Sequence, residues 1–476
     1  MEYLLFWVYH IGMGERRAIE LLEEWLDSYL NFEQTPKKNI FWLETIRFLC
    51  NRFGNPQESF KSFHVAGSKG KGSVSAFLSS ILDEAGYPCG LYTSPHILDL
   101  SERISLAHGP LQEKVYENAL RLMACRVDSV IPEQYPSERE PTWFELMTLY
   151  AFLCFREAGL PWAVFETGLG GRLDSTNVLL PEVSILTPIE LEHTEYLGNT
   201  ITAIAGEKAG IIKKGIPVCS AAQKKEAEDV FRAKALEMGS PILFVNEVLE
   251  DVTYSLEKDE SGVFFMNTKL TFNRFFRRPL SMKLKLLGRV QAENAALASL
   301  VIKQVFPDID ESVIERGLEK ARLPARCEIV ANPYDESGKS MLVLDGAHTV
   351  NSLAGILDTF GKITENRHDA HLLFACASDK DMAHMVKLLL PENPLFEDII
   401  LTKPGDKKHS DLDSLEAAFM KQRNEHKAEQ AVHYSIERDF QTGIKKALQT
   451  AAEKHVPILV TGSFYLVREV KLSFMK

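Results

Sequence analysis

Residues 61–73 read KSFHVAGSKGKGS, and the order of elements in this stretch decides the fold of the first part of the chain. The apolar run at 61–66 predicts a short buried strand, and the spacing of apolar residues after Ser73 predicts an amphipathic helix over 73–86. Between them lies a glycine-rich turn. Consecutive backbone N–H groups and a helix N-terminus can hold phosphate oxygens there, and Lys71 can neutralise their charge. The stretch therefore predicts a phosphate-binding loop.

The loop departs from the common pattern GxxxxGK[ST] in two places. Val65 stands where the pattern has a glycine, and Gly72 separates Lys71 from Ser73. A turn of Gly, Ser and Lys can also arise by chance, but the strand before it and the helix after it favour phosphate binding. The residues expected to hold the phosphates of a nucleotide are Gly67, Ser68, Lys69, Gly70, Lys71, Gly72 and Ser73.

Strand-like runs alternate with helical stretches through the first 320 residues. A helix is expected at 143–158, and strands are expected at 88–93, 162–166, 183–189 and 216–220. This alternation predicts a mostly parallel sheet with helices on both faces. Residues 245–285 differ, because polar and apolar residues alternate there around a turn at 260–262, which predicts a small antiparallel patch.

A second α/β domain is predicted after a strong helix at 291–306. No helical pattern continues through Pro324, and a strand begins after it, so residues 321–328 are interpreted as the linker between domains 1–320 and 329–476. In the second domain, strands are expected at 341–345, 371–377, 398–402, 431–435 and 456–461, and helices at 349–360, 380–390, 412–424 and 438–455. The pattern is Rossmann-like but lacks the GxGxxG fingerprint, so a dinucleotide is not indicated.

Length and composition limit the class of protein. The chain of 476 residues is too long for one hydrophobic core and suits two or three domains. With 45% hydrophobic and 25% charged residues, it has the composition of a soluble globular protein rather than of a disordered, collagen-like or disulfide-rich one. The net charge of −12 argues against general nucleic-acid binding.

The cysteines and the N-terminus indicate a cytoplasmic location. The seven cysteines stand singly, with no CxxC and no Cys/His cluster, which favours reduced thiols and no zinc site. The apolar start at residues 1–10, MEYLLFWVYH, has no basic region and is too short for a signal peptide or a membrane span. We expect a strand or a docking segment there, and no membrane partner.

Further motifs carry a resemblance to a known family. The loop GSKGKGS resembles the phosphate loop of the Mur ligase superfamily, whose members make amide bonds with ATP. Other blocks resemble folylpolyglutamate synthase/dihydrofolate synthase within that superfamily and follow the family's order. They are YTSPH at 92–96, ERI at 102–104, PTWFE at 141–145, FETGLGGRLDSTN at 165–177, HTEYLG at 193–198, EKAGI at 207–211, QAEN at 291–294, DGAH at 345–348 and TGS at 461–463.

This resemblance implies ATP and Mg²⁺ as cofactors, with Ser94, Glu166 and His193 as metal ligands. Glu166 also has an interpretation of its own, because a carboxylate at the carboxyl end of a strand beside glycine-rich backbone can bind Mg²⁺ next to a nucleotide. Without the resemblance, a strand-end Glu or a lone His is more often structural. Lys208 would ordinarily be taken for a surface lysine of a helix, but in the family this lysine is carbamylated.

The remaining site residues also come from the resemblance. Asn294 resembles the residue that contacts adenine, Arg326 the arginine that reaches the ATP phosphates from the second domain, and Asp345 a residue that holds the nucleotide. His348 and Ser463 resemble residues near the incoming glutamate. The resemblance assigns catalytic roles to Lys71, Lys208, His348 and Arg326, and it maps the pterin-binding positions onto Thr142, Phe144 and Asp174.

The chain departs from the family's usual pattern at several positions. Ser68 and Lys69 replace Thr-Asn in the loop, and Glu192 replaces the Asp before His193. Thr349 replaces the Asn after DGAH, and Ala325 replaces the Gly before Arg326. These changes are either neutral drift or signs of a changed substrate, in which case Thr349 points to the amino-acid side.

The resemblance implies an ATP-dependent amide ligase that adds L-glutamate to dihydropteroate, to folate glutamates or to both, through an acyl phosphate. A basic funnel of Lys69, Lys71, Arg103 and Arg172 would suit the anionic acceptor. Two alternatives stay open: a Mur-type ligase that joins an amino acid to a different carboxylate, and a nucleotide-binding regulatory protein on a decayed ligase fold. Small-molecule substrates and a monomeric state are expected.

Overall fold

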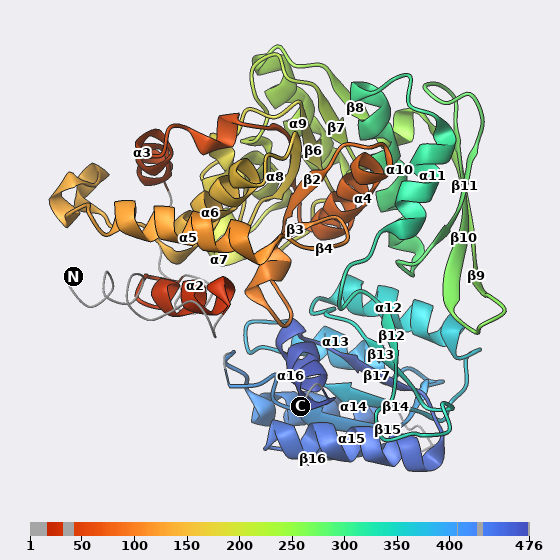
Figure 1. Ribbon diagram of the computed structural model, residues 1–476. Helices are drawn as coiled ribbons and strands as arrows, with labels where there is room; N and C mark the ends of the chain where they lie inside the picture. The colour runs from red at the N-terminus through yellow and green to blue at the C-terminus, as the bar shows by residue number, and fades with distance from the viewer. Residues whose placement is uncertain (1–16, 32–41, 407, 426–431, 475–476) are drawn as a thin grey trace. The chain divides into compact units, whose positions relative to one another are not determined.

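The structure is a computed structural model that describes residues 17–31, 42–406, 408–425 and 432–474 (Figure 1). The strand or docking segment expected at residues 1–10 lies outside the described residues. The chain divides into two compact units. Unit 1 contains residues 1–253, 268–284 and 291–322, and unit 2 contains residues 254–267, 285–290 and 323–476. The domain limits expected from the sequence stay a prediction.

Unit 1 is built on an eight-stranded sheet in the order β4-β3-β2-β5-β1-β6-β7-β8. From β2 to β8 in this order the pairs are parallel, whereas β3 and β4 add an antiparallel edge. The strands are β1 (Lys61–Ala66), β2 (Cys89–Tyr92), β3 (Ile104–Leu106), β4 (Gly109–Pro110), β5 (Trp162–Glu166), β6 (Val183–Leu186), β7 (Val218–Ser220) and β8 (Ile242–Phe244). The mostly parallel sheet predicted from the sequence is confirmed.

Helices cover this sheet. They are α2 (Ala18–Leu26), α3 (Glu44–Arg52), α4 (Lys71–Glu84), α5 (Glu113–Val127), α6 (Trp143–Glu157), α7 (Thr194–Leu197), α8 (Ile201–Ala209), α9 (Lys225–Glu237), α10 (Arg289–Val305) and α11 (Glu311–Lys320). Short 3-10 helices are η1 (Pro56–Glu58), η2 (Leu100–Arg103), η3 (Pro132–Gln134), η4 (Pro136–Glu138), η5 (Ser175–Val178) and η6 (Val245–Glu247). Helix α5 was not predicted from the sequence, although its residues Tyr116, Ala119, Leu120 and Met123 are buried at helical spacing.

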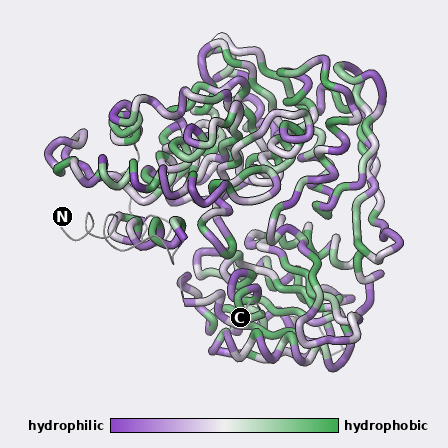
Figure 2. The backbone as a smooth tube through the Cα atoms, in the orientation of Figure 1, coloured by the Kyte–Doolittle hydropathy of each residue, from purple (hydrophilic) through white to green (hydrophobic). Residues whose placement is uncertain are grey.

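The core of unit 1 explains why the central strands are apolar throughout. All five residues of β5 and all four of β6 are buried, as expected for parallel strands with helices on both faces. Helix α6 is also buried on nearly all sides, so it is apolar all round rather than amphipathic. Figure 2 shows this contrast, with hydrophobic residues along the inner strands and hydrophilic residues on the outer turns.

The antiparallel patch predicted for 245–285 is a three-stranded sheet in the order β11-β10-β9. Its strands are β9 (Leu249–Lys258), β10 (Phe264–Phe272) and β11 (Leu280–Leu284). At the predicted turn, one carboxylate oxygen of Asp259 accepts hydrogen bonds from the backbone N–H groups of Ser261 and Val263. The patch is confirmed.

Unit 2 contains a six-stranded sheet in the order β12-β13-β17-β14-β15-β16, in which β12 is antiparallel and the others are parallel. The strands are β12 (Glu328–Ala331), β13 (Met341–Leu344), β14 (Ala370–Phe374), β15 (Phe396–Thr402), β16 (His433–Glu437) and β17 (Ile458–Thr461). The helices are α12 (Val350–Ile363), α13 (Met382–Leu389), α14 (Leu412–Glu425), α15 (Phe440–Lys454) and α16 (Phe464–Phe474). The predicted Rossmann-like alternation is confirmed, with α16 as an additional helix.

Two further findings bear on the expectations from composition. None of the helices in the described ranges combines the length and the hydrophobicity that crossing a membrane requires. All seven cysteines are free thiols, and all but Cys125 are buried.

Candidate active site

The phosphate loop connects β1 to α4, and two of its glycines are required by their surroundings. Gly67 has φ +154° and Gly70 has φ +85°, backbone conformations that residues other than glycine rarely adopt. A Cβ atom at Gly67 would lie 1.8 Å from Thr187 Oγ1, and one at Gly70 would lie 2.5 Å from Asn294 Oδ1. The loop therefore packs directly against the residue that follows β6 and against α10, and the structure places Asn294, the expected adenine contact, beside it.

The backbone of the loop is held by the segment that follows β6. The N–H groups of Ser68 and Lys69 donate to the Pro188 carbonyl at 2.9 and 3.2 Å. The Ser68 hydroxyl donates to the carbonyl of Glu190 at 3.1 Å. Since the first N–H groups of a helix have no intrahelical acceptor, the amides at the start of α4 are the donors that phosphate oxygens would meet.

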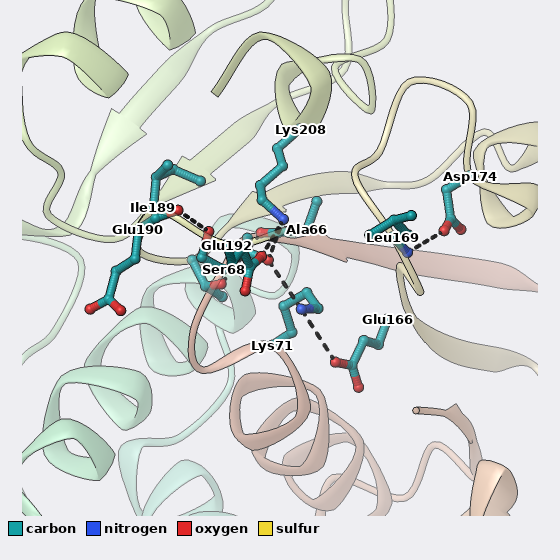
Figure 3. A network of polar contacts seen from close by, with 12 residues as sticks. Ala66, Ser68, Lys71, Glu166, Leu169, Asp174, Ile189, Glu190, Glu192 and Lys208 are labelled. Carbon is teal, nitrogen blue, oxygen red and sulfur yellow. Dashed lines mark hydrogen bonds and ion pairs between the residues drawn. The ribbon is translucent and has the colours of Figure 1, made fainter. Parts of the chain in front are cut away.

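Two lysines converge on the loop (Figure 3). Lys71 Nζ donates to the Gly67 carbonyl at 3.1 Å and lies 3.8 Å from Glu166 Oε1. Lys208 Nζ donates to the same carbonyl at 2.8 Å and lies 2.9 Å from Glu192 Oε1. Interpreting Lys208 as a surface lysine of a helix is wrong, because its side chain is only 2% exposed. The loop thus gathers two ammonium groups and two carboxylates.

Burial sets the protonation of the Lys208–Glu192 pair. It lowers the pKa of Lys208 to about 8, and the neighbouring Lys71 adds to this shift although Glu192 opposes it. Burial also disfavours the ionised form of Glu192, but Lys208 and then Lys71 bring the pKa of Glu192 down to about 2. Glu192 is therefore a carboxylate at neutral pH, and the Lys208 amine loses its proton far more readily than an exposed lysine does.

The expected metal ligands lie at this edge of the sheet. Glu166 ends β5, and its Oε2 accepts a hydrogen bond from the Ser94 backbone N–H at 3.3 Å, so two of the three ligands are brought together. His193 follows Glu192 and has φ +46°, a left-handed conformation that is uncommon for a residue other than glycine. Among the described residues, no group of three His, Cys, Asp or Glu side chains is arranged to hold a metal ion. Glu166 and Ser94 nevertheless offer the oxygen atoms that Mg²⁺ prefers.

The three residues expected at the pterin take part in local structure. Thr142 is the N-cap of α6: its hydroxyl oxygen accepts from the Glu145 N–H at 3.3 Å, and Glu145 accepts from the Thr142 N–H at 2.8 Å. Phe144 packs against Gly168, where a Cβ would lie 2.4 Å from the ring. Asp174 is buried beside the loop that follows β5 and accepts from the Leu169 N–H at 2.9 Å.

The basic funnel expected from the sequence is wrong at Arg103. This side chain is buried, donates to His96 Nδ1 at 2.8 Å and stacks 4.9 Å above the Trp143 ring. Arg172 is exposed but forms an ion pair with Glu207 at 2.9 Å. Arg103 therefore fixes the YTSPH segment against α6 instead of offering its charge to solvent. Such a role follows from contacts between distant segments, which sequence spacing does not reveal.

A second cluster of expected site residues lies in unit 2. Asp345 follows β13, and its two oxygens accept from the N–H groups of Cys327 and Ala347, each at 2.8 Å. Burial raises the pKa of Asp345, although the Arg326 guanidinium opposes the shift. Arg326 itself lies 4.4 Å above the ring of Phe464.

Phe464 connects Arg326 to His348. The His348 and Phe464 rings lie 5.6 Å apart, and His348 Nδ1 is 2.8 Å from the Gly346 carbonyl. Ser463 begins the turn into α16, where its hydroxyl oxygen accepts from the Tyr465 N–H at 3.2 Å. Unit 2 thus brings Arg326 and His348 to the ring of Phe464, and Arg326 also acts electrostatically on Asp345. No sequence pattern predicted the role of Phe464.

Comparison with known proteins identifies the family. The Mur ligase middle domain matches residues 65–302, and the Mur ligase glutamate ligase domain matches residues 325–464. The chain is 35% identical to dihydrofolate synthase/folylpolyglutamate synthase of Bacillus subtilis, over 78% of this chain and 83% of that protein. It is 30% identical to folylpolyglutamate synthase of Lacticaseibacillus casei, over 90% of this chain and 93% of that protein.

The chain belongs to the folylpolyglutamate synthase/dihydrofolate synthase family of Mur ligases. The crystal structure of folylpolyglutamate synthase from Thermotoga maritima has the same fold, with a TM-score of 0.76 at 26% identity, and covers 96% of this chain and 97% of that one. The chain is therefore an ATP-dependent amide ligase, as its sequence motifs predict.

Thr349, which replaces the family's usual asparagine, has a structural explanation. It is the N-cap residue of α12, with its backbone N–H donating to Ser352 Oγ at 3.0 Å and its hydroxyl 2.8 Å from the same oxygen. Asparagine and threonine are both favoured at this helix position. The substitution therefore preserves the start of α12 and does not by itself indicate a changed substrate.

Ala325, which replaces the family's usual glycine, is strained. Its φ is +55°, in the left-handed region, and its carbonyl accepts from the Gly346 N–H at 3.0 Å. A Cβ in this conformation costs about 1 kcal/mol. The glycine of the family has a physical reason here, and this chain carries strain directly before Arg326.

Replacing this residue by glycine, Ala325→Gly, is expected to stabilise unit 2 by about 1 kcal/mol, because the Cβ clash is removed. For a domain of this size the calorimetric midpoint should rise by roughly 2–4 °C. The matched control is Ala417→Gly, an exposed residue within α14, which should lower stability by about 1 kcal/mol. A fall in the midpoint for both variants would contradict the strain at Ala325.

Proposed function

We propose that the chain adds L-glutamate to dihydropteroate, to a folate that already carries glutamate, or to both. The observation that carries this proposal is the convergence of Lys71 and Lys208 on the Gly67 carbonyl, at the loop between β1 and α4. A lysine at the start of a helix, beside free amide donors, suits the phosphates of ATP. Two relatives of the chain are named dihydrofolate synthase/folylpolyglutamate synthase and folylpolyglutamate synthase.

In the proposed reaction, an acceptor carboxylate attacks the γ-phosphorus of ATP, and ADP leaves. The amine of glutamate then attacks the resulting acyl phosphate, and the tetrahedral intermediate expels inorganic phosphate as the amide forms. Lys71 and the amides at the start of α4 would stabilise charge on the transferred phosphoryl group. Arg326 and Asp345 are proposed to bind the nucleotide, and His348 and Ser463 the glutamate.

We further propose that Mg²⁺ binds through Glu166, Ser94 and His193, because Glu166 and Ser94 provide oxygen ligands beside the loop. When bound, such an ion would neutralise charge on the β- and γ-phosphates. The lowered pKa of Lys208 supports carbamylation, since only the neutral amine reacts with carbon dioxide. Asn294 is proposed to contact adenine, and Thr142, Phe144 and Asp174 the pterin ring. A monomeric state is proposed, and light scattering of the purified chain tests it.

The test is phosphate release with product mass, measured on the wild type with ATP, Mg²⁺ and glutamate. Dihydropteroate and tetrahydrofolate monoglutamate are supplied in separate reactions. Turnover of both would establish a bifunctional synthase, and turnover of the glutamylated folate alone would establish a chain-lengthening enzyme. If neither acceptor is consumed, the proposed substrate class is wrong and a screen of other carboxylates follows.

A further inference from the structure

Three buried side chains, those of His64, Thr176 and Asp174, form a hydrogen-bonded series that begins in β1, the strand before the phosphate loop. The proposed function uses only Asp174. His64 Nε2 in β1 lies 2.8 Å from Thr176 Oγ1, and the Thr176 hydroxyl lies within hydrogen-bond distance of Asp174 Oδ1. His64 and Thr176 are fully buried, and Asp174 is 5% exposed. His64 and Thr176 are 112 positions apart in the sequence, so their contact depends on the tertiary fold.

The hydrogen bonds around Asp174 fix its carboxylate at both oxygens. Oδ1 accepts from the Thr176 backbone N–H at 3.0 Å and from the Thr176 hydroxyl, and Oδ2 accepts from the Leu169 N–H at 2.9 Å (Figure 3 shows the contact with Leu169). The terminal torsion of an aspartate has a broad, shallow preference, so these donors determine its orientation.

The number of available protons determines which atom donates in each of these hydrogen bonds. Thr176 has one hydroxyl proton, which it gives to Asp174, so Thr176 Oγ1 can only accept from His64, and Nε2 must carry the imidazole proton. His64 Nδ1 has no hydrogen-bond partner among the described residues. A bare Nδ1 leaves a buried acceptor unpaired, whereas a protonated Nδ1 would leave a buried donor unpaired, which is rarer. Burial, with Lys213 adding to it, lowers the pKa of His64 to about 3, so the ring is neutral.

We propose that His64 and Thr176 are positioning residues that orient the Asp174 carboxylate toward the pterin ring of the acceptor. This inference rests on the proposed function, in which Asp174 contacts the pterin. The amino group and the ring N–H of a pterin present two donors side by side to a carboxylate, so the rotation of the carboxylate plane decides how well both are accepted. His64 aligns Thr176, and Thr176 holds this plane.

The test uses the full chain with three substitutions in the hydrogen-bonded series and a fourth, Asp174→Asn, as the reference. Thr176→Val removes only the hydroxyl, His64→Leu removes the N–H donor, and His64→Gln keeps an N–H donor at a comparable reach. Thr176→Val and His64→Leu are each expected to raise the KM for the pterin acceptor about tenfold, with kcat and the KM for ATP changed less than about twofold. His64→Gln should restore the acceptor KM to within about threefold of wild type. The double variant His64→Leu/Thr176→Val should be no worse than either single variant, because all members act through one carboxylate.

Asp174→Asn separates failure of this inference from failure of the proposed function. If Asp174→Asn leaves the acceptor KM unchanged, the pterin role of Asp174 is wrong and the positioning role is overturned with it. If Asp174→Asn raises the acceptor KM but Thr176→Val does not, only the positioning role is overturned. Equal effects on the KM values for ATP and acceptor, or additive effects in the double variant, would also overturn it, since they indicate general disruption of β1.

A spectroscopic measurement covers the case in which a variant does not fold. In the folded wild type, ¹⁵N NMR of His64 is expected to show a protonated Nε2 and a bare Nδ1. The opposite tautomer would mean that Thr176 donates to His64 and not to Asp174, and would overturn the proposal without any activity assay.

Discussion

The substitution Lys71→Met is expected to lower kcat/KM at least 100-fold while the chain stays folded. The Lys71 ammonium lies at the start of α4, 3.1 Å from the Gly67 carbonyl and 3.8 Å from Glu166 Oε1, where phosphate charge would develop. Loss of one preorganised charged donor at such a position costs about 10²–10³ in rate. Methionine keeps the length of the apolar stem and removes only the charge. The rate of phosphate release under saturating ATP, compared with wild type, therefore measures what this charge contributes to catalysis.

Lys61→Met is the matched control for this experiment. Lys61 begins β1, the strand that leads into the phosphate loop, and its exposed ammonium lies 3.4 Å from Glu182. An exposed pair of this kind contributes little to stability, and the residue has no part in the proposed site. Activity of Lys61→Met should remain within about twofold of wild type. If both variants lose activity equally, the effect comes from the charge or folding of β1 and not from the loop.

The substitution Glu192→Leu is expected to destabilise unit 1 by about 3–5 kcal/mol at pH 7. It removes the carboxylate beside the buried Lys208 ammonium and leaves the hydrogen bond to the Gly67 carbonyl, and removal of one member of a buried ion pair is strongly unfavourable. The tryptophans of the described residues, Trp25, Trp42, Trp143 and Trp162, all belong to unit 1, so their fluorescence during denaturant unfolding reports this unit. The measured quantity is the free energy of unfolding, extrapolated to water.

Two comparisons make this prediction specific to the ion pair. The double variant Glu192→Leu/Lys208→Met replaces both charges by apolar groups and should recover most of the lost stability, although not the activity. Without Glu192 the pKa of Lys208 falls further, because Glu192 is the group that raises it. Folded Glu192→Leu therefore lacks a proton at Lys208 that the folded wild type still binds up to about pH 8, so the deficit should shrink as the pH rises toward 8 and stay constant from there to pH 10. A deficit independent of pH, with no recovery in the double variant, would show that the loss comes from packing.

Local patterns in the sequence determined most of the secondary structure. The strand at 61–66, the glycine turn and the helix that follows it are read from residues close together in the chain, and so are the five strands expected after residue 340. The antiparallel patch follows from alternation around one turn. These features depend on periodicity and turn chemistry, which a single sequence displays. The family followed from short motifs whose residues the chain retains.

The tertiary structure alone decided which charges are buried and which atoms they contact. Lys208 reaches the Gly67 carbonyl across 141 positions, and this approach makes it a buried amine paired with Glu192. Arg103 was expected to face solvent and is buried against Trp143, and the unusual backbone of Ala325 depends on how its loop meets Gly346. The sequence lists the titratable groups, but burial and neighbours set their protonation, and both arise only when distant segments pack together.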